Sequence, residues 1–196
     1  MAQGRDNARC HDSSYGATEF NPHREISQRF RPFTSRGRTV PTLYGATELI
    51  GALSETLFHL VPPEGEDRCV RQSRLMEWML STLAPRRDLA LVDLRDVALP
   101  TLGFGLTREA LIDSPDLSYP ATARWASAFF HSSAKPDGLV WNARQDRKAE
   151  AMILFARGRV ARHDLEVVQP PMPLYGSPGF DRVLEAAESA GITIVT

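Results

Sequence analysis

The chain has 196 residues, enough for one domain with a sizeable core, and its 42% hydrophobic and 24% charged residues are typical of a soluble globular protein. Its 23 Lys and Arg residues nearly balance 24 Asp and Glu residues, which gives no support for a strongly nucleic-acid-binding or membrane-surface protein. No apolar run approaches the ~18 residues of a membrane helix, and the N-terminus lacks the apolar core of a signal peptide. We expect one cytoplasmic domain over residues 1–196, with residues 1–8 as a flexible N-terminus.

The first part of the chain predicts loops and then two helices. Residues 1–40 show little periodic apolar pattern and indicate loops with one short strand at most. Residues 41–45 favour a strand, and Thr47 suits the N-cap of the segment that follows. Apolar residues at helical spacing predict a helix over 48–60, which a Pro-Pro pair ends, and a second helix over 71–84.

The rest of the chain interleaves short strands and helices. Strands are expected over 88–94, 139–141, 151–155, 160–168 and 192–195, and helices over 107–112, 121–131 and 181–190. The segment Pro170-Pro171-Met172-Pro173 predicts a rigid loop, and Gly191 ends the last helix. Because the connections are irregular and several strands lie close together in sequence, we expect a mixed-sheet α+β domain and not a doubly wound parallel sheet.

Several well-known chemistries are disfavoured because their motifs are missing. Gly103-Phe104-Gly105 lacks the third glycine of a dinucleotide fingerprint, and there is neither a phosphate-binding Gly-Lys-Ser/Thr loop nor a Gly-x-Ser-x-Gly elbow. The five histidines never fall at metal-ligand spacing on a helix, and Cys10 and Cys69 form no metal or redox motif. The sequence therefore predicts no metal site and reduced cysteines.

Four polar residues stand in a suggestive order along the chain: Arg9, Arg29, Tyr44 and Glu55. They fall in a series of short motifs that spans nearly the whole chain, namely RCH (9–11), FNP (20–22), RFRPF (29–33), PTLYGA (41–46), ALSETLFH (52–59), LVDL (91–94), IDSPDLSYPAT (112–122) and DGLVWNARQ (137–145). In these motifs and their order the sequence resembles the RES family, toxins of bacterial toxin–antitoxin pairs that are named for an Arg, a Glu and a Ser.

The resemblance implies a fold related to ADP-ribosyltransferases and a pocket that takes NAD+ as substrate, with no prosthetic group and no metal. It also implies an Xre-like antitoxin that covers the pocket, without direct contact to nucleic acid or membrane, and it allows a homodimer. Family members cleave NAD+ by hydrolysis or phosphorolysis, whereas others transfer ADP-ribose to a protein. Three hypotheses remain open: an NAD+-degrading toxin, a protein ADP-ribosyltransferase, and a catalytically weakened binding protein.

The resemblance also implies roles for individual side chains. Glu55 would stabilise the oxocarbenium-like state or hold a ribose hydroxyl, as carboxylates do in glycoside cleavage. Arg9 and Arg29 would grip the pyrophosphate, and Tyr44 would lie against the nicotinamide ring. Without the resemblance, the arginines read as solvated and Tyr44 as a packing residue, and helical periodicity places Glu55 on a solvent-facing side.

One position departs from the family pattern. The family has a Ser immediately before the Arg that Arg144 matches, and this chain has Ala143 there. Both positions would lie in the NAD+ site, and a hydroxyl that orients phosphate, water or ribose is missing. Asn142 or Ser54 remain open as substitutes. We therefore expect reduced turnover, altered acceptor choice or an inactive pocket.

Overall fold

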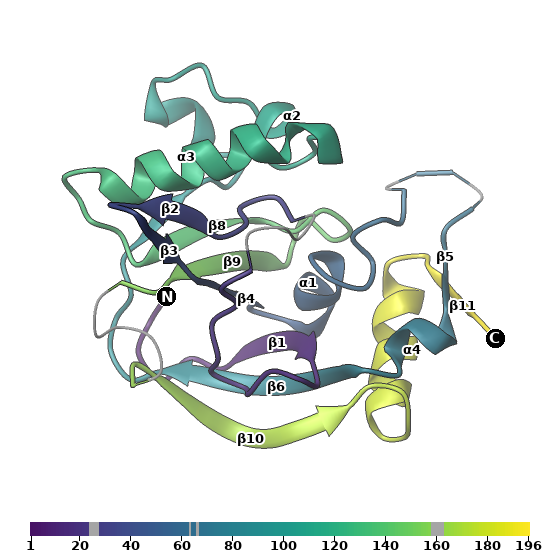
Figure 1. The fold of residues 1–196 in the computed structure, drawn as a ribbon. Helices are drawn as coiled ribbons and strands as arrows, with labels where there is room; N and C mark the ends of the chain where they lie inside the picture. Colours follow the sequence, from purple (N-terminus) through teal and green to yellow (C-terminus); the bar gives the residue numbers. More distant parts are fainter. Residues whose placement is uncertain (24–27, 63, 66, 158–162) are drawn as a thin grey trace.

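The computed structural model describes residues 1–23, 28–62, 64–65, 67–157 and 163–196, and the features below refer to these. Within them a seven-stranded sheet runs in the order β10-β6-β1-β4-β9-β8-β7 (Figure 1). Its strands are β1 (Asn7–Asp12), β4 (Thr42–Ala46), β6 (Trp78–Pro85), β7 (Leu91–Asp93), β8 (Gly138–Asn142), β9 (Glu150–Phe155) and β10 (Leu165–Pro173). Neighbouring strands are antiparallel except for β7 and β8, which run parallel. The expected mixed-sheet α+β fold is confirmed.

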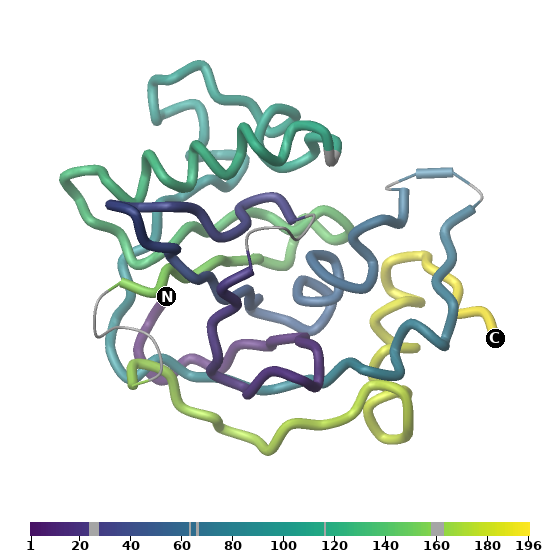
Figure 2. Tube along the Cα trace, viewed as in Figure 1, coloured from purple at the N-terminus to yellow at the C-terminus, as the bar shows by residue number. Residues whose placement is uncertain are grey.

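The described part of the chain has four α-helices: α1 (Leu49–Ser54), α2 (Arg108–Leu111), α3 (Tyr119–His131) and α4 (Gly179–Ser189). Short 3₁₀ segments cover Gln72–Leu75, Leu99–Leu102 and Asp116–Ser118, and two small ribbons pair β2 (Phe33–Ser35) with β3 (Arg38–Val40) and β5 (Cys69–Arg71) with β11 (Thr193–Val195). Figures 1 and 2 show α2 and α3 beyond β8 and β9, α4 beside β5 and β11, and α1 between these two groups.

The sheet opens between β1 and β4. These strands pair at a single register position, Ala8 with Ala46. By contrast, β1 pairs with β6 and β4 pairs with β9 along their whole lengths. At the start of β4, Thr42 pairs with Asn21 and not with β1. The N–H of Asn21 donates to the carbonyl of Thr42 (2.8 Å). Because the two strands diverge, a space remains between the two halves of the sheet. The pocket described below lies in this space.

Buried side chains lie on both faces of the sheet because successive residues of a strand point to opposite faces. The larger cluster includes Phe30, Leu53, Trp141 and Ile153, together with side chains of α1, α3 and α4. The smaller cluster gathers Phe20, Leu43, Leu83, Leu89, Leu154 and Leu165. Burial on two faces explains why several strands show no clear alternation of polar and apolar residues.

Most predicted elements after residue 85 are confirmed. Strands occur at β7, β8, β9 and β11, and helices at α2, α3 and α4, each within a few residues of its expected range. Thr107 caps α2 by accepting the N–H of Ala110 (3.3 Å), and Gly191 ends α4 with a left-handed backbone (φ 64°). Of the strand expected over 160–168, residues 160–162 lie outside the described residues, and β10 begins at Leu165.

The helix predicted over 71–84 is wrong. A 3₁₀ turn (Gln72–Leu75) is followed by β6, which lies between β10 and β1. A strand inside a sheet with both faces covered presents a nearly continuous apolar run, which periodicity cannot distinguish from a buried helix. The loop expected over 170–173 is also wrong, since these residues belong to β10. Because β10 is an edge strand with irregular register, its prolines need not donate to a neighbour.

Two further expectations in the N-terminal third are wrong. Residues 1–40 hold three strands, β1, β2 and β3, in place of loops with at most one. The helix expected over 48–60 ends at Ser54, and its N-cap is Glu48. Thr47 instead accepts the backbone N–H of Glu150 (3.1 Å) and so joins the helix start to β9.

The start of the chain is attached to the sheet. The amino group of Met1 donates to the carbonyl of Leu89 (3.0 Å), and the N–H of Gly4 donates to the carbonyl of Pro85 (2.9 Å). β1 then begins at Asn7, inside the segment 1–8 expected to be flexible. In the described residues, none of the helices has the length and apolar character that crossing a membrane requires.

Gly138 at the start of β8 allows a close approach to β9. A Cβ at this position would lie 2.0 Å from the carbonyl oxygen of Ile153, whereas a Cβ at Gly176 would meet no atom within 4 Å. We predict that Gly138→Ala lowers the free energy of unfolding by about 2 kcal/mol or more, because the backbone of a paired strand must move. Gly176→Ala, as the control, should stay within about 0.5 kcal/mol of the wild type. Chemical denaturation of both variants measures this, and equal stabilities would contradict the close approach.

Candidate active site

A buried ion pair forms the centre of the candidate site. Glu55 follows the last residue of α1, and Arg29 precedes β2. Nη1 of Arg29 donates to Oε2 of Glu55 at 2.9 Å, and the two side chains are only 1% and 3% exposed. The solvent-facing position that periodicity indicates for Glu55 is therefore wrong. Burying two charges costs several kcal/mol per ion unless they are paired and hydrogen-bonded, so this pair constrains its surroundings.

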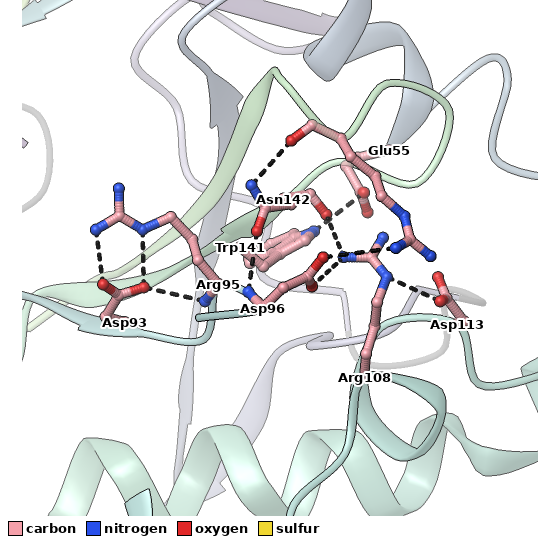
Figure 3. Close-up of polar contacts among 9 residues, drawn as sticks. Glu55, Asp93, Arg95, Asp96, Arg108, Asp113, Trp141 and Asn142 are labelled. Atoms are coloured by element: carbon pink, nitrogen blue, oxygen red, sulfur yellow. Dashed lines mark hydrogen bonds and ion pairs between the residues drawn. The ribbon is translucent and has the colours of Figure 1, made fainter. Parts of the chain in front are cut away.

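A tryptophan completes the contacts of the carboxylate. Nε1 of Trp141, in β8, donates to Oε1 of Glu55 at 3.1 Å (Figure 3). Each oxygen of Glu55 thus has its own donor. The indole is fully buried and makes edge-to-face contacts with Phe30 (5.2 Å between ring centroids) and Tyr44 (6.1 Å). Sequence reasoning did not select Trp141, although it lies in the quoted motif DGLVWNARQ.

Tyr44 lies beside this pair. Its hydroxyl accepts the backbone N–H of Phe30 at 3.1 Å. Burial raises the pKa of Tyr44, and the nearby Glu55 carboxylate raises it further, so the phenol stays neutral at physiological pH. The structure therefore brings together Arg29, Tyr44 and Glu55, three of the residues expected in the site.

A pocket of about 300 Å³ occupies the opening between β1 and β4. Its size is at the lower end of the range for small-molecule sites. The lining residues are Arg9, Cys10, His11, Asp12, Tyr15, Asn21, Gln28, Thr42, Leu43, Tyr44, Thr56 and Trp78. Cys10, Tyr44 and Thr56 also line a narrow crevice at Glu55 that has no room for a water molecule (≈ 0 Å³). Glu55 is thus separated from the pocket by the side chains that the pocket and the crevice share.

Arg9 lines the same pocket, and three of its N–H groups donate to backbone carbonyls. Nη1 donates to the carbonyls of Gly16 (3.2 Å) and Ala17, and Nη2 donates to the carbonyl of Glu19 (2.7 Å). Burial lowers the pKa of Arg9 to about 10, which still leaves it charged at neutral pH. Arg9 therefore brings positive charge to the pocket wall while its terminal nitrogens hold the loop after β1. Arg29 differs, since its Nε and Nη2 have no hydrogen-bond partner among the described residues.

Ala143 and Arg144 follow Trp141 and Asn142 in the chain, at the end of β8. Ala143 is fully buried in the main core cluster, and its N–H donates to the carbonyl of Ala149 (2.9 Å). Nη1 of Arg144 contacts the carbonyl of His59 at 3.4 Å. Neither residue lines the pocket.

The two candidate substitutes for the missing hydroxyl are engaged elsewhere. The hydroxyl of Ser54 donates to the carbonyl of Ile50 (2.7 Å) within α1. The side chain of Asn142 accepts the N–H of Asp96 (3.0 Å) and donates to the carbonyl of Arg147 (2.9 Å). Both side chains therefore serve local structure.

Asn142 belongs to a polar network that holds the end of β8. Arg108, buried at the start of α2, donates to Asp113 (2.8 Å), to Asp96 (2.8 Å) and to the carbonyl of Asn142 (3.2 Å). Figure 3 shows this network beside the contact of Trp141 with Glu55. Since Trp141 and Asn142 are consecutive in β8, the network fixes the backbone from which the indole projects.

His11 is a pocket residue that sequence reasoning did not select for the site. Its Nδ1 lies 3.0 Å from the carbonyl of Asp12, which can only accept, so Nδ1 carries the proton and Nε2 accepts from the hydroxyl of Ser81 (2.8 Å). Burial lowers the pKa of His11, and Arg9 lowers it further, so the ring is neutral at pH 7. His11 lies in the quoted motif RCH (9–11), next to Arg9 and Cys10, which line the same pocket.

Comparison with known proteins identifies the family of the chain. A family model described as RES domain matches residues 8–175. The match covers most of the chain, and the chain therefore belongs to the RES domain family. No curated protein matched the sequence. In the part of the chain that the structure describes, His, Cys, Asp and Glu side chains form no group that could hold a metal ion.

The two cysteines should differ sharply in reactivity. Burial raises the pKa of the Cys10 thiol to about 12, whereas Cys69 is exposed in β5. Since the thiolate is the nucleophile, we predict that iodoacetamide at pH 8 modifies Cys69 and leaves Cys10 intact in the folded protein. Mass spectrometry of tryptic peptides measures this, and denatured protein modified at both sites is the control. Equal labelling of the folded protein would show that Cys10 is open to solvent.

Proposed function

We propose that this member of the RES domain family binds NAD+ as a substrate in the pocket between β1 and β4 and breaks the nicotinamide–ribose bond. The observation that carries the proposal is the buried carboxylate of Glu55, held by Arg29 and Trp141 directly behind that pocket. The reaction needs no prosthetic group, because the positively charged nicotinamide is already a good leaving group.

Glu55 supports the reaction through its charge. Departure of nicotinamide leaves positive charge on the ribose, in an oxocarbenium-like state such as glycosidases stabilise with carboxylates. A carboxylate in a dry, low-dielectric environment stabilises such charge far better than one in water. Arg29 contacts one of the two oxygens, and the other accepts a neutral indole N–H.

Arg29 and Tyr44 supply the remaining contacts. The Nε and Nη2 donors of Arg29, unpartnered among the described residues, suit an oxygen of the substrate pyrophosphate. Tyr44 reaches both the pocket and the crevice at Glu55 and offers a neutral aromatic ring to the nicotinamide. Arg9 adds attraction for the anionic dinucleotide through its charge alone.

The acceptor of the ADP-ribosyl group distinguishes three forms of the proposal. Water gives hydrolysis, phosphate gives phosphorolysis, and a side chain gives protein ADP-ribosylation. The family supports a role as the toxin of a bacterial toxin–antitoxin pair, with an Xre-like antitoxin over the pocket and a homodimer as a further possible assembly. A catalytically weakened binding protein is the second candidate, favoured by Ala143 and by the lack of room for water beside Glu55.

Glu55→Gln tests the first candidate. The amide keeps the shape of the side chain but loses the negative charge, so we predict a fall in NAD+ consumption of at least about 100-fold, and relief of growth arrest on expression. Glu185→Gln, on the exposed surface of α4, is the matched control and should retain wild-type turnover. Circular dichroism of each variant checks the fold, and product analysis with and without phosphate identifies the acceptor. Full activity of a folded Glu55→Gln protein contradicts the proposed role.

Ala143→Ser restores the hydroxyl of the family pattern. We predict that it raises NAD+ turnover, since Ala143 lies two residues from Trp141 in the same core cluster. Time-resolved chromatography of NAD+ and nicotinamide for the wild type and the variant measures the change. If neither protein consumes NAD+ with water, phosphate or a protein acceptor, the enzymatic proposal fails and the binding protein is favoured.

A further inference from the structure

We infer that Trp141 is a positioning residue that fixes the orientation of the Glu55 carboxylate for the reaction. The inference rests on the proposed function. The side chain of Trp141 is fully buried in the main core cluster. An aromatic ring without a polar atom would suffice for that packing. The single polar atom of the Trp141 side chain, Nε1, is directed at an oxygen of Glu55.

The carboxylate has two donors with different properties. Arg29 holds Oε2 at 2.9 Å and Trp141 holds Oε1 at 3.1 Å. A single contact leaves the terminal torsion of a glutamate broad, because a carboxylate can turn about its last bond with little cost. A second donor on the other oxygen restricts that torsion. Since the indole is neutral, it does so without cancelling the negative charge that the reaction uses.

The indole is itself held from two directions. Its ring lies edge-to-face against Phe30 and Tyr44 and is fully buried. Its backbone continues into Asn142, whose carbonyl and side chain are bound by Arg108 and by the N–H of Asp96 (Figure 3). A donor with so little freedom loses little entropy when it orders its acceptor, which is the property a positioning group requires.

Trp141→Phe separates the ring from the donor. We expect it to lower kcat for NAD+ cleavage about tenfold or more, with KM changed less than about twofold, because the carboxylate loses orientation while the pocket lining is unaltered. Trp125→Phe is the matched control, since Trp125 packs against Phe104 and Phe129 and lines neither the pocket nor the crevice. It should retain wild-type kcat.

The contact can also be measured without turnover. The chain has 3 tryptophans, so a ¹⁵N spectrum shows three indole N–H signals, which Trp125→Phe and Trp141→Phe assign. We expect Glu55→Gln to move the Trp141 signal more than the other two, and Glu185→Gln to move none. In the wild type the Trp141 indole N–H should exchange with solvent most slowly of the three. An unmoved Trp141 signal, or fast exchange, overturns the inference even if Trp141→Phe fails to fold.

The outcomes separate this inference from the proposed function. A wild type that consumes no NAD+ under any acceptor condition overturns the proposed function. An active wild type with an equally active, folded Trp141→Phe variant overturns the positioning role alone. A loss of activity that appears as raised KM with unchanged kcat also overturns it, because that pattern belongs to substrate binding.

Discussion

The buried ion pair of Arg29 and Glu55 is the constraint on which the rest of this structure depends. Two charges removed from water at a cost of several kcal/mol each must be compensated locally. The chain meets this requirement by ending α1 at Ser54, so that Glu55 turns inward, and by directing Trp141 at the second oxygen. The core around the pair is aromatic, with Phe30 and Tyr44 against the indole. Polar and apolar parts of the interior are therefore organised by the same few side chains.

The opening of the sheet between β1 and β4 gives this pair its relation to the surface. Had the two strands paired along their lengths, Cys10 and Tyr44 would face each other across a closed ladder, with no pocket between them. The single pair of Ala8 with Ala46 keeps the halves together at one end only. Two polar residues of β1 near the opening already have partners, Arg9 in backbone carbonyls and His11 in Ser81. The narrow crevice at Glu55 shares Cys10, Tyr44 and Thr56 with the pocket.

The sequence predicted those parts of the fold whose apolar residues fit only one kind of element. α3, α4 and the strands β8 and β9 follow from periodicity and from residue type. β6 does not, because its apolar residues fall at a spacing that also fits a buried helix. Glu55 is the clearest failure of local reasoning: its helical position indicates solvent, and the two residues that bury it lie far away along the chain. Family resemblance identified Glu55, Arg29 and Tyr44, but neither periodicity nor resemblance could show that Arg9 donates to the carbonyls of the loop after β1 or that Trp141 reaches the carboxylate.

The separation of these partners in sequence affects when the site can form. Arg29 precedes Glu55 by 26 residues, whereas Trp141 follows it by 86. A chain emerging from the ribosome therefore presents the charged pair long before the strand that supplies the indole has been synthesised. Until β8 takes its place between β9 and β7, one oxygen of Glu55 has no donor and the aromatic cover is incomplete. A nascent or truncated chain that lacks residue 141 therefore cannot assemble this centre.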